Sequence, residues 1–308
     1  MPTTPATDEL PRPDALRLPF RLSVALVVLT VVVILFGAMT TGTGSGLAFA
    51  DWPLSDGELM PDRAFTEPQA FLEHFHRVLA SCAGLLSVVI CVLVFRASGS
   101  TKIQRRLALS GLILISVQGV IGGIGVLELL PRYNSATHGT LAQVTISVFA
   151  AMAYQLSSRR AATKAEPHSH AGSGRVLAMI TLVLLIVQAF LGAVARHSPP
   201  GEGTHALWSH VGNAVIVFLV IIITLGVTAR LEHIPGLKRL GQLGMGFLMV
   251  QVSLGFIALL VRRGKDPENI EYLWRAALIS SHVLVGALLT VLAALVVAHV
   301  RAGTRLDS

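Results

Sequence analysis

The segment Leu107-Ala-Leu-Ser-Gly-Leu-Ile-Leu-Ile-Ser-Val-Gln-Gly-Val-Ile-Gly122 is almost entirely apolar, and the apolar run continues to Leu127. About 20 residues of this kind are enough to cross the hydrocarbon core of a bilayer as an α-helix. The chain contains eight such runs, and the segments between them carry most of its charges. The predicted spans are 20–40, 72–95, 107–127, 136–157, 174–195, 207–229, 239–262 and 276–300. The sequence therefore predicts an all-α membrane protein with eight transmembrane helices.

The composition supports this class. Only 13% of the 308 residues are charged and the mean hydropathy is +0.69, whereas a soluble domain has about 25% charged residues. The net charge of +7 comes from the segments between the apolar runs, so it does not indicate a basic nucleic-acid-binding domain. The two cysteines, Cys82 and Cys91, lie in one run at a spacing typical of neither a redox pair nor a zinc site. We interpret both as small core residues, and their separation along one helix excludes a disulfide.

The distribution of charges predicts the topology. The tails and the loops after even-numbered spans hold 16 basic and 6 acidic residues, a net charge of +10, whereas the other loops hold 8 and 11, a net charge of −3. The positive-inside rule therefore places both termini in the cytoplasm, with the chain in the cell inner (plasma) membrane. We expect residues 1–19, which lack the pattern of a signal peptide, to form a disordered cytoplasmic tail. Residues 301–308 are expected to form a second cytoplasmic tail.

A short pattern, Gln-x-x-x-Gly, recurs in the odd-numbered runs. It occurs as Gln118–Gly122, Gln188–Gly192 and Gln251–Gly255, with a weaker copy at Val33–Gly37. Each copy precedes a run that opens near a histidine, so the repeated unit is either a helix hairpin used four times or a four-helix half used twice. Four helices return the chain to its starting side, which makes the two halves a parallel repeat. The predicted halves are 20–157 and 174–300, joined by a cytoplasmic linker, 158–173.

The pattern itself has two interpretations. Glycine lets two helix backbones approach closely and glutamine forms an interhelical hydrogen bond, which makes helix packing the favoured interpretation. Direct contact with a bound ligand is the alternative.

Four histidines lie near the start of the even-numbered runs, all on one side of the predicted membrane. They are His76, His138, His210 and His282. An imidazole at this depth is costly, and it caps a helix, relays protons or binds a ligand. Low-spin heme iron takes two axial imidazoles at about 2 Å each, from opposite faces. The sequence predicts two such pairs, His76 with His138 and His210 with His282, which would hold two hemes or two metal centres.

The other seven histidines lack this placement. His74 lies on a different helix face from His76, and His197 and His205 belong to an outer loop, with His205 as a fallback ligand. The remaining four, His168, His170, His233 and His299, belong to the cytoplasmic side.

The segment Glu73-His-Phe-His-Arg77 places a carboxylate one helical turn before His76. Glu73 is therefore a candidate to orient the imidazole or to act on a substrate as an acid or base. The alternative is an acid at a helix N-terminus that pairs with Arg77. Arg77 is itself a candidate to neutralise heme propionates.

The outer loop 41–71 is long and rich in glycine, with the sequence Gly42-Thr-Gly-Ser-Gly-Leu-Ala-Phe-Ala-Asp-Trp-Pro-Leu-Ser-Asp-Gly57. Glycine permits tight turns and close approach of the backbone to a ligand, and Trp52 suits the membrane interface. The two interpretations, a lid that only closes the bundle and a loop that contacts a ligand, stay open.

Three motifs in this region, together with the four histidines, resemble the heme A synthase family (CtaA-type, cytochrome oxidase assembly). The motifs are Gly44-Ser-Gly-Leu47, Asp51-Trp-Pro-Leu54 and Glu73-x-x-His-Arg77, and the resemblance extends over residues 20–300. It implies an enzyme that oxidises the C8 methyl of heme O to the formyl of heme A, by successive hydroxylations, for terminal oxidases. It also implies a b-type heme at His210 and His282, and substrate heme at His76 and His138 with Glu73 beside the reacting edge.

Two departures from the family pattern stand in the outer loop. Phe49 and Ser55 occupy the positions where many bacterial members have a cysteine pair, so a loop disulfide is excluded. Thr41 occupies the position of an arginine that precedes the Gly-Ser-Gly-Leu motif.

Two other functions use the same histidines. One is a di-heme b-type cytochrome that transfers quinol electrons, although a long glycine-rich loop is not needed for that role. The other is a transporter with histidine proton relays, which the scarcity of acidic residues within the spans disfavours. For the synthase, the expected partners are heme O, membrane lipid, a quinol or other electron donor and a heme O synthase, with no nucleic acid.

Overall fold

A computed structural model describes residues 14–198, 202–261 and 270–306. The long helices are α1 (Arg17–Gly42), α3 (Pro68–Arg96), α4 (Lys102–Leu127), α5 (Arg132–Gln155), α7 (Ala171–His197), α8 (Thr204–Thr228), α9 (Leu237–Val261) and α10 (Ile270–Gly303). The short elements are η1 (Asp14–Leu16), α2 (Arg63–Thr66), α6 (Ser158–Ala162), β1 (Glu166–Pro167) and β2 (Thr304–Arg305). Each long helix covers one of the predicted apolar runs, so the all-α class is confirmed.

Among the described residues, seven of the long helices are long and apolar enough to cross a membrane, and α5 is the long helix outside that group. The reason is its position between other helices, where Gln143, Thr145 and Ser147 are buried and do not face lipid. On the helices that flank the bundle, large apolar side chains such as Leu85 and Val215 are 69% and 60% exposed. Such exposure is expected of a helix surface solvated by lipid.

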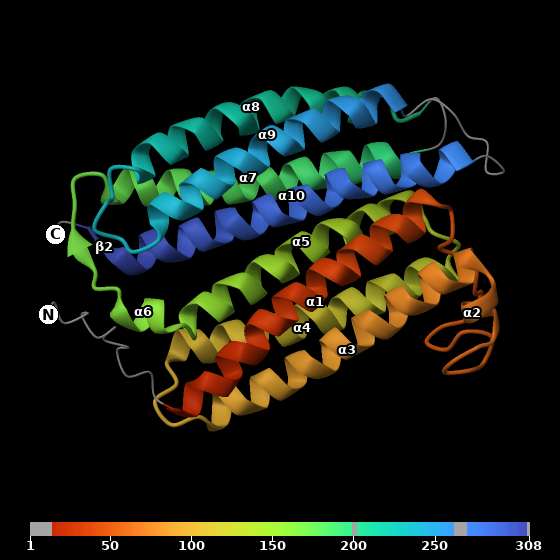
Figure 1. The fold of residues 1–308 in the computed structure, drawn as a ribbon, viewed down its shortest axis with the longest axis horizontal. Coiled ribbons are helices and arrows are strands. Elements are labelled where there is room, and N and C mark those ends of the chain that lie inside the picture. Colours follow the sequence, from red (N-terminus) through yellow and green to blue (C-terminus); the bar gives the residue numbers. More distant parts are fainter. Residues whose placement is uncertain (1–13, 199–201, 262–269, 307–308) are drawn as a thin grey trace, which may run out of the picture.

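The helices form two groups that lie side by side (Figure 1). The N-terminal half contains α1, α3, α4 and α5, and the C-terminal half contains α7, α8, α9 and α10. Between them, Ile34 of α1, Ile146 of α5 and Ala287 of α10 form a buried apolar cluster. We call the end of the bundle that carries the segment 43–67 the loop end. We call the opposite end, where α1 begins and α10 ends, the terminal end.

Local signals explain where helices begin at the two ends. Helix α3 starts with Pro68, whose missing N–H is not needed in a first turn. Helix α4 starts with a capping box, in which the Thr101 hydroxyl accepts from the Gln104 N–H and the Gln104 amide oxygen accepts from the Thr101 N–H. The Gln104 amide also donates to the Gln155 carbonyl over 2.7 Å, which joins the start of α4 to the end of α5.

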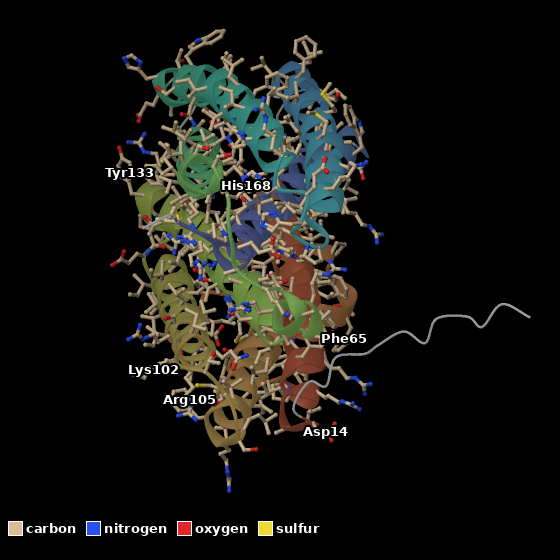
Figure 2. The ribbon with its side chains drawn as sticks, turned by 90° about the vertical axis from the view of Figure 1, so that its left-hand side faces the viewer. Asp14, Phe65, Lys102, Arg105, Tyr133 and His168 are labelled. Atoms are coloured by element: carbon tan, nitrogen blue, oxygen red, sulfur yellow. The ribbon has the colours of Figure 1, made fainter. Side chains whose placement is uncertain are left out.

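The terminal end is more ordered than the sequence indicates (Figure 2). Residues 14–19 were expected in a disordered tail, but they form η1 and the first residues of α1, while residues 1–13 lie outside the described residues. The expected linker contains α6 and β1, and β1 pairs in parallel with β2 in the expected C-terminal tail. Arg175 reinforces this pairing by donating to the Thr304 hydroxyl over 2.9 Å. The short pairing depends on contacts between distant segments, which local sequence does not reveal.

The structure corrects the expectation for one of the two cysteines, and part of the charge count falls outside the described residues. Cys91 is buried as expected, but Cys82 is exposed, because nine residues are two and a half helical turns and place the two side chains on opposite faces. Four of the basic residues in the charge count, Arg12, Arg262, Arg263 and Lys265, lie outside the described residues.

Candidate functional site

Two pairs of histidines face each other near the loop end of the bundle. His76 of α3 faces His138 of α5 with ring centroids 6.5 Å apart and an angle of 79° between the ring planes. His210 of α8 faces His282 of α10 at 6.3 Å, with the same angle of 79°. The structure thus brings together the four histidines in the two pairs that the sequence indicates.

The separation within each pair fits a single iron between the rings. Two imidazoles on one iron have Fe–N bonds of about 2 Å, and each ring centre lies about 1 Å beyond its Nε2, so the ring centres are about 6 Å apart. Both pairs have this spacing. Among the described residues, no group of three or more His, Cys, Asp or Glu side chains could hold a metal ion.

A backbone carbonyl fixes the tautomer of one imidazole in each pair. The Nδ1 of His76 lies 3.1 Å from the Val33 carbonyl oxygen, and the Nδ1 of His210 lies 3.0 Å from the Gln188 carbonyl oxygen. A carbonyl can only accept, so Nδ1 carries the proton and Nε2 keeps its lone pair for a ligand. Val33 and Gln188 are the first residues of two copies of the repeated pattern. The Nδ1 atoms of His138 and His282 are buried without a hydrogen-bond partner among the described residues, so a carbonyl selects the tautomer in one histidine of each pair.

In each copy of the pattern, the glycine at the fifth position lies against the ring of a paired histidine. A Cβ built on any of these glycines would lie 2.8–2.9 Å from Cε1 of a paired histidine, which is closer than real Cβ contacts allow. The glycine–histidine contacts are Gly37 with His76, Gly122 with His138, Gly192 with His210 and Gly255 with His282. We call the carbonyl of the first residue together with the glycine of the fifth residue a histidine seat. The favoured interpretation, helix packing, is confirmed, and its specific purpose is to receive an imidazole.

The glutamines of the pattern add a second contact. Gln118 donates to the backbone carbonyl of His138 over 2.8 Å, and Gln188 donates to that of His210 over 2.9 Å. The Gln251 amide nitrogen lies 3.3 Å from the Nε2 of His282. His76 lacks this contact, because its seat has Val33 instead of glutamine.

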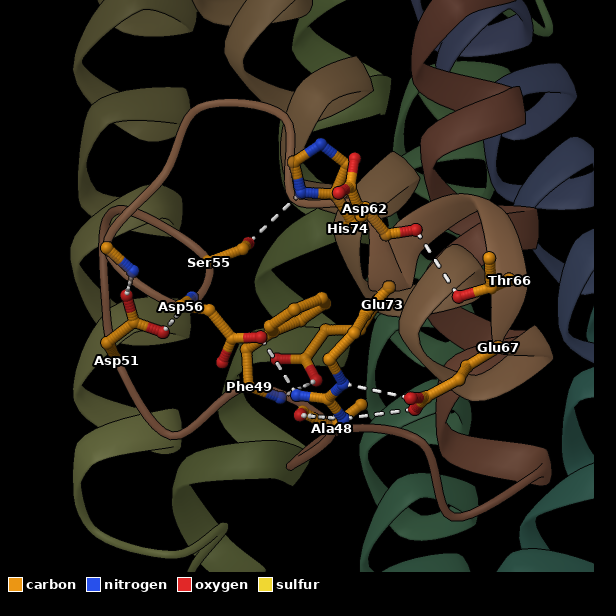
Figure 3. A network of polar contacts seen from close by, with 12 residues as sticks. Ala48, Phe49, Asp51, Ser55, Asp56, Asp62, Thr66, Glu67, Glu73 and His74 are labelled. Atoms are coloured by element: carbon orange, nitrogen blue, oxygen red, sulfur yellow. Dashed lines mark hydrogen bonds and ion pairs between the residues drawn. The ribbon is translucent and has the colours of Figure 1, made fainter.

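Glu73 and Arg77 connect α3 to the loop, and Figure 3 shows Glu73 beside Phe49 of the loop. The Arg77 guanidinium donates to the carbonyls of Asp51 and Leu54 over 2.7 and 2.6 Å, and to that of Phe49 over 3.3 Å. It also forms an ion pair with Glu73, whose other carboxylate oxygen accepts from the Phe49 N–H over 3.1 Å. The ion pair expected as the alternative for Glu73 is therefore present, and both of its members hold the loop.

The outer loop, which precedes α3 in the chain, also contacts α4. His74 directs its Nδ1 toward the Ser55 hydroxyl at 3.0 Å (Figure 3) and its Nε2 toward the Met60 sulfur at 3.3 Å. The Trp52 ring lies against Gly123 of α4, where a Cβ would come within 2.5 Å of the ring. Residues 48–60 thus cross from α3 to α4 beside the N-terminal pair, and we call them the strap.

Charged groups stiffen the far side of the strap. Arg63 donates to Asp56 over 2.9 Å and to Glu67 over 3.0 Å. The hydrogen bond from Arg63 lowers the pKa of Glu67 below its ordinary value. Slight burial opposes ionisation of Asp51, but backbone N–H donors of Gly57 and Asp56 outweigh it and lower the pKa of Asp51.

A family model described as cytochrome oxidase assembly protein matches residues 20–201, which is more than half of the chain. The match includes the strap, His76 and His138, and it ends before His210 and His282. The chain belongs to the CtaA-type heme A synthase family. Curated heme A synthases are similar to it at modest identity. The protein from Symbiobacterium thermophilum is 27% identical over 258 residues, 76% of this chain and 83% of the relative. The one from Geobacillus kaustophilus is 24% identical over 167 residues, 54% and 52% of the two chains, and the one from Brucella ovis is 30% identical over 132 residues, 40% and 36%.

The structure shows what stabilises the strap at the two loop positions that depart from the family pattern. Phe49 is fully buried, with the guanidinium carbons of Arg63 and Arg77 at 5.3 and 5.7 Å from its ring centre. Ser55 is 1% exposed and holds His74. Apolar packing and a hydrogen bond therefore stabilise the strap at the two positions where a disulfide is excluded.

The other histidines are not members of the pairs, although His74 lies two residues from His76 on α3, and His197 ends α7 instead of lying in an outer loop. His205 is exposed on the first turn of α8, so the fallback ligand is not needed. At the terminal end, His168 stacks on His233 with ring centroids 5.5 Å apart, and His299 packs on Tyr154 at 3.9 Å. Sequence reasoning missed the contact of Trp52 with Gly123, because that contact joins segments 71 residues apart.

Proposed function

We propose that this chain is a heme A synthase-like oxidoreductase that converts the C8 methyl of heme O to the formyl of heme A for terminal oxidase biogenesis. The family supports the reaction class. The observation that carries the proposal is the pair of equivalent histidine sites, each spaced for one iron, of which the N-terminal one lies beside a strap. A resident cofactor needs no cover, whereas a substrate under oxidation benefits from exclusion of water.

The two sites have different proposed roles. His210 and His282 hold heme b as a resident cofactor, and His76 and His138 receive the substrate heme O. In the C-terminal half, the connection between α7 and α8 has only residues 198–203, of which 199–201 lie outside the described residues. Such a short connection cannot cross to a neighbouring helix as the strap does, which supports the C-terminal site as the resident one.

The chain's own groups bind, orient and enclose the substrate. Heme iron supplies the redox chemistry when it is bound. The seats keep the Nε2 atoms of His76 and His138 directed inward, and Glu73, one turn from His76, is the proposed group that holds or moves a proton near the reacting methyl. Because the Arg77 guanidinium is already occupied by three loop carbonyls and Glu73, we propose it as the anchor of the strap instead of a ligand to propionates.

The proposed membrane arrangement follows from the charges. The terminal end carries the excess of basic residues, with Lys102 and Arg105 among those visible in Figure 2. We propose that eight helices cross the plasma membrane as two parallel four-helix repeats, with both termini in the cytoplasm. The electron donor is proposed to be a quinol or another donor, and a heme O synthase is the proposed source of substrate.

The test is heme analysis in a host that lacks heme A and expresses this chain beside a heme O synthase. We expect heme A or its hydroxylated precursor in extracts analysed by chromatography and mass spectrometry, and its loss in His76→Ala. The control is His205→Ala, which changes an exposed histidine at the loop end of the bundle and should leave the product unchanged. Unchanged heme O together with bound heme B would reject the synthase and identify a di-heme cytochrome.

A further inference from the structure

Arg196 is a cation placed over the C-terminal histidine pair. It lies on α7 four residues after Gly192, whose Cα supports His210, so it is about 6 Å further toward the loop end. Its guanidinium and the Ala276 side chain of α10, six residues before His282, both lie against Gly42 of α1. A half-buried guanidinium within a membrane helix is costly unless an anion accompanies it.

Among the described residues, no carboxylate supplies that anion. The Arg196 Nη2 donates to the Ala38 carbonyl of α1 over 2.8 Å. None of the ion pairs between described residues involves it. Small residues surround the guanidinium, since a Cβ built on Gly42 would lie 3.2 Å from the Arg196 Nη2 and 3.1 Å from the Ala276 side chain. Three helices therefore meet closely around a cation without a carboxylate.

The repeat shows that this cation is not part of the seat. The equivalent positions, four residues after the seat glycine, are Thr41 in α1, Val126 in α4 and Leu259 in α9. A role in holding the histidine would require a similar residue at each of them. The cation is therefore particular to α7, the helix whose seat receives His210.

We propose that Arg196 binds a carboxylate of the tetrapyrrole held by His210 and His282. A heme carries two propionates, and the planar guanidinium fork matches a carboxylate with two parallel hydrogen bonds. This assignment rests on the proposed binding of heme at the C-terminal pair and is independent of the conversion of heme O.

The assignment predicts the redox behaviour of that heme. The reduced heme is one charge more negative than the oxidised heme, so a nearby cation stabilises the reduced form and raises the midpoint potential. Loss of the cation lowers the potential and weakens retention of the heme. We expect the loss of one charge-assisted hydrogen bond to make the release of heme b about tenfold faster.

The experiment uses the full chain with the N-terminal site emptied by His76→Ala and His138→Ala, in a host without heme O. Arg196→Gln is compared with Arg196→Lys and with Arg175→Gln, which removes a cation from the other end of the same helix. The measurements are the midpoint potential of the bound heme b and its rate of transfer to apomyoglobin. We expect a lower potential and about tenfold faster transfer for Arg196→Gln, a smaller change for Arg196→Lys, and neither change for Arg175→Gln.

A second measurement covers the case in which Arg196→Gln does not fold. Heme dimethyl ester, whose carboxylates are blocked, is added to the heme-depleted chain that retains Arg196, and its release is compared with that of heme b. Faster release of the ester is expected, and equal release of the two would overturn the proposal. An unchanged potential and transfer rate in folded Arg196→Gln would overturn it as well, while the proposed synthase function would stand. If the chain bound no heme at the C-terminal pair, both the role of Arg196 and the proposed resident heme b would be overturned.

Discussion

The two histidine pairs are almost the same in geometry and differ in what surrounds them. Both have rings at 79°, with centroids 6.5 Å apart in the N-terminal half and 6.3 Å apart in the C-terminal half. The N-terminal pair lies beside the strap, and one of its seats has Val33 where the C-terminal half has Gln188. The C-terminal pair has Arg196 above it, where the N-terminal half has Thr41. The repeat therefore builds the ligand geometry, and the surroundings differentiate the two sites.

The seats explain how one fold can hold four imidazoles in equivalent orientations. A glycine provides space for the ring at all four histidines, and a helix carbonyl one turn before that glycine selects the tautomer of His76 and His210. Both groups come from the helix that precedes the histidine, so each hairpin positions its own ligand. A duplicated hairpin therefore carries a complete ligand position with it.

The largest expected effect separates the two pairs by removing one ligand from each. His282→Ala removes an axial ligand of the proposed resident heme and should abolish bound heme b, whereas His76→Ala should leave heme b in place and abolish heme A. Pyridine hemochrome spectra of the purified variants measure the first effect, and extracted heme profiles measure the second. Loss of heme b in His76→Ala with retention in His282→Ala would reverse the assignment of the two sites.

The next effect concerns the seats. Gly122→Ala and Gly255→Ala introduce a Cβ at 2.9 Å from Cε1 of His138 and His282, so each should displace one imidazole and lower the heme occupancy of its own site. The matched controls are Gly119→Ala and Gly246→Ala on the same two helices, where no atom lies within 4 Å of the new methyl. The controls should be neutral or more stable by up to about 1 kcal/mol, because alanine favours helix.

Low-spin ferric EPR measures this effect, since the signal depends on the angle between the two axial imidazole planes. Gly255→Ala should alter the signal of the C-terminal heme, and Gly122→Ala should not. Equal behaviour of the seat variants and their controls would show that the imidazoles do not depend on the glycines.

The strap should give a moderate effect that is confined to the N-terminal half. Gly123→Ala places a methyl within 2.5 Å of the Trp52 ring and should force the strap away from α4 without changing any histidine. We expect heme A formation to fall by about tenfold or more, because displaced groups lose productive geometry, with heme b content unchanged. Heme extraction and limited proteolysis of residues 48–60 check this result. Undiminished product with a cleavable strap would limit the strap to a structural role.

Much of this comparison could be predicted from the sequence, for identifiable reasons. The apolar runs predict the helices, and the repeated pattern with its histidines predicts the pairs, because both are periodic or local patterns that can be read from the sequence directly. The role of Arg77 was harder to predict, since its partners are backbone carbonyls of Asp51 and Leu54, which every residue possesses. Trp52 and Arg196 depend on contacts between helices far apart in the chain, and no local pattern marks them. The ordered linker with β1 and β2 was missed for the same reason.

The smallest expected effect is a loosening of the strap in acid. Asp51 and Glu67 both have pKa values lowered in the folded state, so their contribution to strap stability is fully present above their ordinary pKa values of about 4. That contribution is lost as the pH falls through the lowered values. Hydrogen exchange in residues 48–67 should therefore rise below about pH 4 while exchange in the C-terminal half stays constant. Glu67→Gln should remove part of the pH dependence, because it gives weaker protection above about pH 4 and similar protection in acid, where Glu67 is protonated. A pH response of equal size in both halves would show general acid destabilisation instead, because only the N-terminal site has a strap that depends on ionised carboxylates.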